Sequence, residues 1–112
     1  MAKFTINDVE LEFDIYELEN AEKYEAQIEK MRKVGEMAAK ETGLARSIKL
    51  QCEAIFDFID TLFGEGSAKK LFGERTNLVN CANVYYKVIS EIAKDRSALP
   101  NVHSREQRRK SK

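Results

Sequence analysis

The chain has 112 residues, of which 43% are apolar and 34% are charged. This length fits one domain, and the apolar share excludes a chain that is unfolded throughout. The sequence contains no run of about 18 apolar residues, so it predicts no membrane span. Its start, MAKFTINDVELEFD, alternates apolar and polar residues and lacks the apolar segment of a signal peptide. We therefore expect a protein of the cytoplasm.

The charges are unevenly distributed along the chain, although 19 lysines and arginines balance 19 aspartates and glutamates. Residues 1–95 hold 13 basic and 18 acidic side chains, a net charge of −5, whereas residues 96–112 hold six basic and one acidic, a net charge of +5. We predict one domain over residues 1–95 and a disordered basic tail over residues 96–112. Because an acidic body lacks the positive face that phosphate binding needs, nucleic acid is not expected as the main partner.

Residues 3–13 predict a β-hairpin with a two-residue turn at Asn7-Asp8, since both residue types tolerate positive φ. The register pairs the apolar residues with one another on one face, as Ala2 with Phe13, Phe4 with Leu11 and Ile6 with Val9. The other face pairs Thr5 with Glu10 and Lys3 with Glu12. A slip of one residue would invert one strand, so the pattern specifies this register.

Three long helices and one short helix are predicted after the hairpin. The first runs from an N-cap at Asn20 to about Thr42, and the second spans residues 44–63 between Gly43 and Gly64. A short helix over residues 68–72 follows Ser67 as its cap, and the last begins near Thr76 or Asn77 and ends at Asp95. The fold class is therefore mainly α (α+β). The predicted core consists of Ile28, Met31, Ile48, Ile55, Ile59, Leu62, Tyr85, Val88 and Ile92.

Residues that could carry out catalysis or hold a metal ion do not occur in a recognisable pattern. The only histidine, His103, falls in the predicted tail, and Cys52 and Cys81 lack metal-ligand spacing and fall on apolar helical stripes. The glycines at 64 and 66 lack the GxxxxGK[ST] pattern of a phosphate loop and follow a helix, so they indicate a helix stop. We predict no enzyme activity, no catalytic residues, no cofactor and no metal site.

Three features suit contact with other proteins. Val79, Tyr86 and Ala93 recur every seven residues beside the apolar stripe of the last helix, and the hairpin, with Phe4 and Ile6, has edges that can accept another strand. The basic tail, with Arg108 and Arg109, suits an acidic surface. Each feature also has a simpler interpretation. The hairpin or the short helix covers the Val79 stripe, the hairpin merely packs across the helices, and the tail only aids solubility.

Several segments resemble small proteins of tailed phages and prophages of Gram-positive bacteria whose place among tail genes suggests tail-assembly chaperones. The similarity covers about residues 3–95 and is carried by FDFIDTLFGEG at 56–66, KKLFG at 69–73, Asn77, YYKVI at 85–89 and the hairpin segments FTI and VELEF. The resemblance implies a helical chaperone in the cytoplasm of the bacterial host. Such a protein coats the long tape-measure protein while the tail tube is built, and it often forms homo-oligomers. Families of this kind also often make a longer, frameshifted product.

The expected function is therefore that of a phage tail-assembly chaperone whose partners are proteins. Two other classes stay open at this point. One is a structural component of the virion, such as a head–tail connector or a tail completion protein. The other is a small nucleic-acid-binding regulator, which the net charge of −5 over residues 1–95 disfavours.

Overall fold

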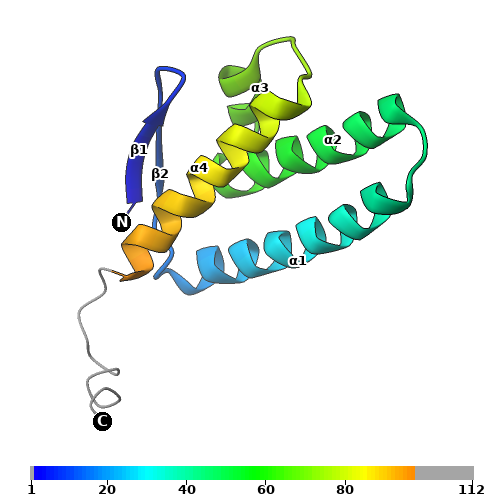
Figure 1. The fold of residues 1–112 in the computed structure, drawn as a ribbon. Coiled ribbons are helices and arrows are strands. Elements are labelled where there is room, and N and C mark those ends of the chain that lie inside the picture. Colours follow the sequence, from blue (N-terminus) through cyan, green and yellow to red (C-terminus); the bar gives the residue numbers. More distant parts are fainter. Residues whose placement is uncertain (1, 98–112) are drawn as a thin grey trace.

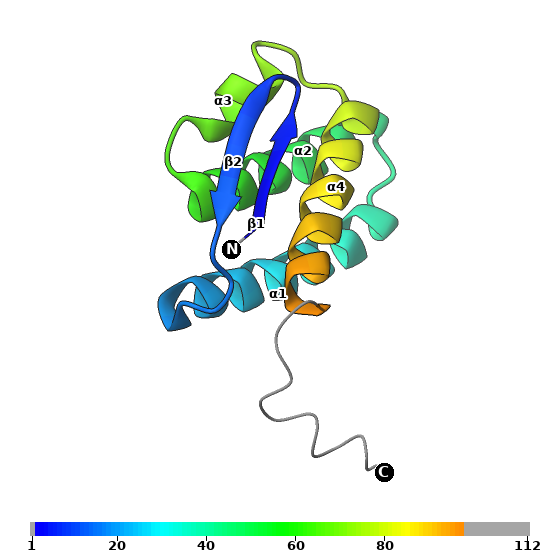
Figure 2. The same cartoon turned by 90° about the vertical axis from the view of Figure 1, so that its left-hand side faces the viewer.

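The computed structural model describes residues 2–97 and confirms a mainly helical α+β fold with an N-terminal hairpin (Figure 1). The elements in chain order are β1 (Ala2–Ile6), β2 (Val9–Phe13), α1 (Leu18–Lys40), α2 (Leu44–Phe63), α3 (Ser67–Phe72) and α4 (Leu78–Ser97). Helix α2 is central, because α1, α3 and α4 all pack against it. The hairpin covers another side of the core, with β1 next to α4 and β2 in contact with α2 (Figure 2).

The hairpin has the predicted turn and register. Residues Asn7 and Asp8 take φ values of 51° and 65°, which are the positive values of a type I′ turn. The strands are antiparallel, and each predicted pair from Ala2↔Phe13 to Ile6↔Val9 is present. The Asn7 side-chain amide also donates a hydrogen bond to the Leu71 carbonyl oxygen at 3.1 Å. This bond attaches the turn to α3.

The apolar face of the hairpin packs on the helices, which is the simpler of the two interpretations of this segment. Phe4 and Phe13 are both buried, and their rings lie edge-on to the ring of Phe63 at centroid distances of 6.1 and 5.9 Å. Phe13 also contacts the ring of Tyr24 on α1. The hairpin is therefore part of the core. This packing supplies the stability that a two-stranded sheet lacks on its own.

The two ends of α1 differ from the prediction. The helix begins at Leu18, and the Asn20 amide donates to the Asp14 carbonyl oxygen at 3.0 Å, so Asn20 stabilises the preceding connection and is not the N-cap. At the other end the helix stops at Lys40, two residues before Thr42. Helix α2 has the predicted bounds.

The start of α3 is capped by a residue from another helix. The backbone N–H of Ala68 donates to Oδ1 of Asp60, on α2, at 2.8 Å. The hydroxyl of Ser67 instead donates to the Phe63 carbonyl oxygen at 3.1 Å, so the prediction of Ser67 as the cap is wrong. At α4 the prediction is confirmed, because Oδ1 of Asn77 accepts from the Asn80 N–H at 3.0 Å.

The core is centred on the buried face of α2. Phe58 is fully buried there, and its ring lies 6.5 Å from that of Tyr24 on α1 and 5.0 Å from that of Tyr85 on α4. Five residues of the predicted core are buried, namely Ile55, Ile59, Leu62, Val88 and Ile92. The other four pack against this cluster and are partly exposed. On α1, Val34 is buried although it was not among the predicted core residues, and the neighbouring Gly35 is exposed.

The predicted tail lies almost wholly outside the described residues, as do Arg108 and Arg109, while α4 continues to Ser97. We expect deletion of residues 98–112 to leave the fold intact, because this segment has no apolar periodicity that would dock on the domain. The melting temperature should change by less than about 4 °C, the shift that corresponds to roughly 0.5 kcal/mol in a domain of this size. A larger fall in a calorimetric scan would place the segment within the folded domain.

Candidate protein-binding groove

An open groove lies between α1 and α4, with α2 as its floor. It has a volume of about 480 Å³, and apolar side chains from all three helices line most of it. Helix α4 contributes Leu78, Ala82, Tyr85, Tyr86 and Ile89. The distance from Leu78 to Ile89 along the axis of α4 is about 16 Å at 1.5 Å per residue. The groove therefore extends over about three helical turns.

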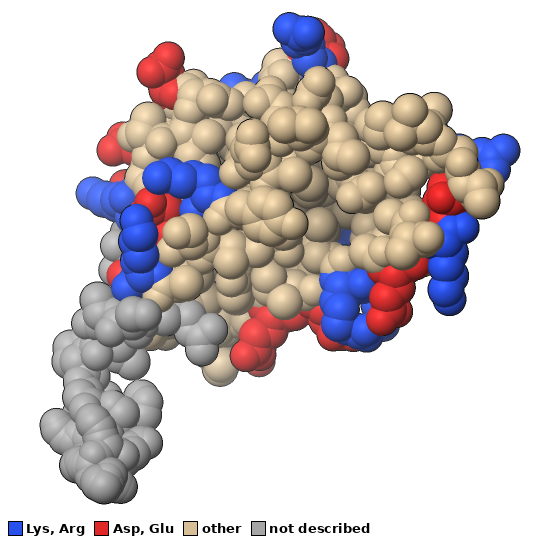
Figure 3. Space-filling model, in the orientation of Figure 1, with Lys and Arg blue, Asp and Glu red and all other residues tan. Residues whose placement is uncertain are grey.

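The Val79 stripe lies on the exposed surface of α4 next to this groove. Side chains of Val79 and Tyr86 are 69% and 66% exposed, and Ala93 is also exposed. The interpretation that the hairpin or α3 covers the stripe is therefore wrong. Figure 3 shows that uncharged residues occupy the centre of the face on which α4 lies, with charged residues gathered near its margins. Exposed apolar side chains such as Val79 and Tyr86 are typical of interaction surfaces.

Ion pairs lie on both helices that form the walls of the groove. On α1, Arg32 binds Glu29 at 2.7 Å and Glu36 at 2.6 Å, and its hydrogen bond lowers the pKa of the Glu29 carboxyl. On α4, Glu91 binds Lys87 at 3.1 Å and Lys94 at 3.4 Å, and the hydrogen bond from Lys87 lowers the pKa of Glu91. In each pair at least one of the two side chains is largely exposed to solvent, so these ion pairs contribute little to stability.

Phe4 and Ile6 lie on the apolar face of the hairpin, and contact of a partner with the hairpin edge stays a prediction. Both side chains are buried against the helices, with exposed fractions of 8%. The physical reason is the alternation of β1, which turns every second side chain towards the core. A partner at the hairpin would therefore meet its backbone edge and its outer side chains.

The two cysteines lie together in the core between α2 and α4. Cys52 and Cys81 are both fully buried, as their apolar stripes predicted. Burial and the neighbouring Cys52 thiol raise the pKa of Cys81 to about 12. The Cys81 thiol therefore stays protonated at neutral pH, and a neutral thiol is a poor nucleophile and a poor metal ligand.

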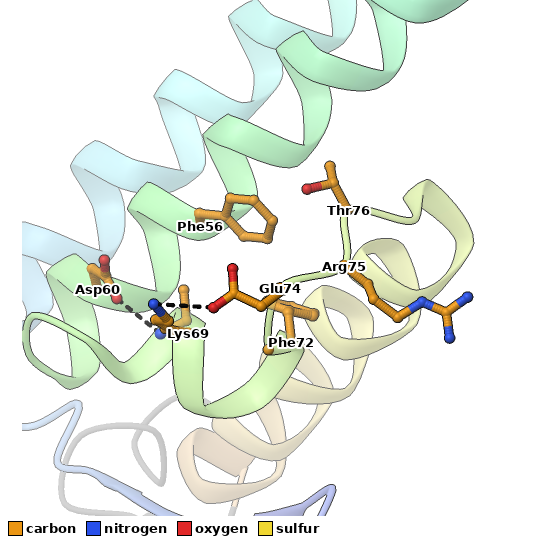
Figure 4. Close-up of a pocket in the computed structure, with 9 residues that line it drawn as sticks. Phe56, Asp60, Lys69, Phe72, Glu74, Arg75 and Thr76 are labelled. Carbon is orange, nitrogen blue, oxygen red and sulfur yellow. Dashed lines mark hydrogen bonds and ion pairs between the residues drawn. The ribbon is translucent and has the colours of Figure 1, made fainter.

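A second cavity of about 340 Å³ lies at the corner of α2 and α3 (Figure 4). Its polar groups interact with one another: Asp60 caps α3, and Lys69 binds Glu74 at 3.2 Å. The side chain of Arg75 points away from the cavity in Figure 4. This arrangement indicates a structural role for the cavity residues, because Asp60 already accepts a hydrogen bond from the backbone of α3.

Within residues 2–97, no three histidine, cysteine, aspartate or glutamate side chains come close enough together to bind a metal ion. None of the helices over the same residues has the length and apolar character needed to cross a membrane.

The groove itself was not predicted, although several of its residues were assigned to the core. Tyr85, Ile28 and Met31 were expected to be buried, and they instead lie partly exposed along its walls. Gly35 leaves open space on the α1 wall of the groove, because a Cβ added there would meet no atom within 4 Å.

Searches of curated proteins and of solved structures give no match. Residues 7–112 match the model of a family whose description is "Family of unknown function (DUF6673)". The match covers nearly the whole chain, so this protein belongs to that family.

Proposed function

We propose that this protein binds other proteins without catalysing a reaction, and that it acts as a phage tail-assembly chaperone. The observation that supports this most directly is the apolar groove between α1 and α4, beside the exposed stripe of Val79 and Tyr86. Apolar surface that remains exposed on a folded domain costs free energy in water, and a partner that covers it recovers that free energy.

The shape of the groove suits the apolar face of an α-helix. Its length of about three turns fits side chains at positions i, i+3, i+4 and i+7 of a bound helix. A volume of about 480 Å³ accommodates the side chains of one helical face but not a whole helix. The bound helix would lie along the groove, with its apolar side chains directed towards α2.

The tape-measure protein is the proposed client because of the sequence resemblance. Three of the residues that carry this resemblance, Tyr85, Tyr86 and Ile89, line the groove. A long helical client presents many apolar stripes before the tail tube encloses it. A small acidic body with an apolar groove would cover such stripes and keep the client soluble.

Co-expression with the tape-measure protein of the same phage or prophage genome tests this function. We expect the tagged chain to keep the client soluble and to co-purify with it. Tyr86→Asp should reduce the recovered client at least about tenfold, because it places a carboxylate in a desolvated apolar contact. Leu18→Asp is the matched control, since Leu18 is 74% exposed, lies outside the groove and tolerates an acid in the first turn of α1.

Two results would contradict the proposal. One is the absence of a complex with a tape-measure protein that is present in soluble form. The other is a stoichiometric amount of this chain in purified virions, which would indicate a structural tail or connector component. Circular dichroism of Tyr86→Asp verifies that the variant is folded, as expected for a residue with 66% of its side chain exposed.

A further inference from the structure

The outer edge of β2 offers backbone hydrogen-bonding groups that no other segment of residues 2–97 uses. In a hairpin with a two-residue turn, the residues that flank the turn exchange backbone hydrogen bonds, and every second pair along the strands does the same. Ile6↔Val9 is the pair that flanks the turn. The N–H and C=O groups of Glu10 and Glu12 therefore point away from β1, and within residues 2–97 they have no hydrogen-bond partner. The other strand differs, because α4 packs beside β1 (Figure 2).

This edge lacks the features with which edge strands commonly avoid pairing. β2 contains neither lysine nor proline, and its register with β1 has no bulge. The free backbone groups of Glu10 and Glu12 recur about every 7 Å, which is the two-residue repeat of an extended chain. An extended segment can therefore bond to this edge without any change in the hairpin.

The charge around the edge is negative. The side chains of Glu10 and Glu12 are both exposed. Residues 2–14 hold one basic and four acidic side chains, a net charge of −3. Residues 60–74, whose helix α3 is bonded to the hairpin turn, hold two basic and three acidic side chains, a net charge of −1. The two adjoining segments together carry −4, so the edge attracts a positively charged segment and repels a negatively charged one.

The opposite face of the sheet is apolar. Val9 on β2 and Phe63 on α2 both lie on that side, where they pack against the core and stay partly exposed. Successive side chains of a strand point to opposite faces of a sheet. A segment paired with β2 would therefore direct every second side chain towards the apolar side and the others towards Glu10 and Glu12.

We propose that β2 binds an extended segment of a partner protein, in which basic and apolar residues alternate, as the third strand of the sheet. Backbone hydrogen bonds to Glu10 and Glu12 would hold the segment, and its basic side chains would lie beside the two carboxylates. A second copy of β2 does not suit this edge, because it would bring the glutamates of both strands together. The site is separate from the groove, and it does not depend on the function proposed for the groove.

A capped nine-residue peptide in which lysine and valine alternate is the probe, added to the full chain. In the free chain we expect the amides of Glu10 and Glu12 to exchange rapidly with solvent. On binding, their NMR signals should shift and their exchange should slow about tenfold or more. The control peptide has the same sequence with alternate backbone nitrogens methylated. It keeps the charge and the apolar side chains but lacks donors, so it should bind at least about tenfold more weakly.

A charge reversal tests the acidic side chains. Glu10→Lys with Glu12→Lys should weaken binding of the lysine–valine peptide about tenfold or more and should permit binding of a peptide in which glutamate and valine alternate. Glu22→Lys with Glu25→Lys is the matched control. It changes the net charge by the same amount at exposed positions of α1, away from the strands, and should alter the affinity by less than about threefold.

Three results would overturn the inference. The first is the absence of binding up to about 1 mM peptide. The second is equal binding of the methylated peptide, which would indicate contact through charge alone. The third is slow exchange of Glu10 and Glu12 in the free chain, which would mean that another segment, such as residues 98–112, already fills the edge.

The groove provides the remaining comparison. Tyr86→Asp should leave the affinity for the lysine–valine peptide unchanged, because Tyr86 lines the groove and not the hairpin. Signal shifts at Tyr85 and Ile89 that disappear in Tyr86→Asp would place the peptide in the groove and overturn the assignment to β2. Binding at β2 by a chain that fails to bind the tape-measure protein would exclude the proposed client and keep the strand site.

Discussion

Replacing Ile59 by alanine is expected to lower the free energy of unfolding by about 2–5 kcal/mol. Ile59 is fully buried on α2, in the cluster that joins this helix to the other elements of the core. The substitution removes three methyl or methylene groups from a packed interior and leaves a cavity that its neighbours fill only in part. Because a domain of this size has about 5–15 kcal/mol in total, this loss is a large fraction of its stability.

Urea denaturation, monitored by circular dichroism, measures this change. The urea concentration at the midpoint of unfolding should fall, while the dependence of the unfolding free energy on urea concentration stays constant. Leu18→Ala serves as the control, because Leu18 is largely exposed and its truncation should alter the unfolding free energy by no more than about 0.5 kcal/mol. A loss under about 1 kcal/mol for Ile59→Ala would mean that Ile59 is not central to the core.

A comparable loss, about 3–5 kcal/mol, is expected for Phe13→Ala. Phe13 lies at the end of β2 with 3% of its surface exposed, and its ring contacts those of Tyr24 on α1 and Phe63 on α2. Aromatic contacts of this geometry contribute beyond the area that they bury. Removing the ring therefore deletes the ring contact of the hairpin with Tyr24 and one of its two ring contacts with Phe63.

The matched control for Phe13→Ala is Glu10→Ala, on the same strand but on its exposed face. It should change the unfolding free energy by about 0.5 kcal/mol or less. Equal effects of the two substitutions would show that the hairpin does not pack on the helices. Loss of native hydrogen-exchange protection throughout the domain in Phe13→Ala would agree with a single cooperative unit.

The hairpin was predictable from the sequence because its signals are local and consistent. The turn residues Asn7 and Asp8 fix the loop length, and alternation along both strands then leaves only one register with an apolar face. The bounds of α2 were predictable for a similar reason, since glycines stand at both ends of a strongly periodic segment.

The groove and the cap of α3 were not predictable in the same way, because each depends on how separate elements meet. Asp60 caps α3 only because the chain turns back at Gly64 and Gly66, and Ser67 offered a plausible local alternative. The periodicity of α1 and α4 identifies their apolar faces but not the distance between the two helices. That distance decides whether Tyr85 is enclosed or lines an open groove.

The contacts of the hairpin have a consequence for synthesis on the ribosome. β1 and β2 are made first, but β1 packs beside α4, and the turn is bound to Leu71 on α3. At about 5–20 residues per second, the ribosome needs roughly 4–18 s to make the 90 or so residues from β1 to the end of α4. A two-stranded hairpin is not stable alone during that interval. Nascent chains that end before α4 should therefore remain open to proteases, and protection should appear only when the last helix has left the exit tunnel.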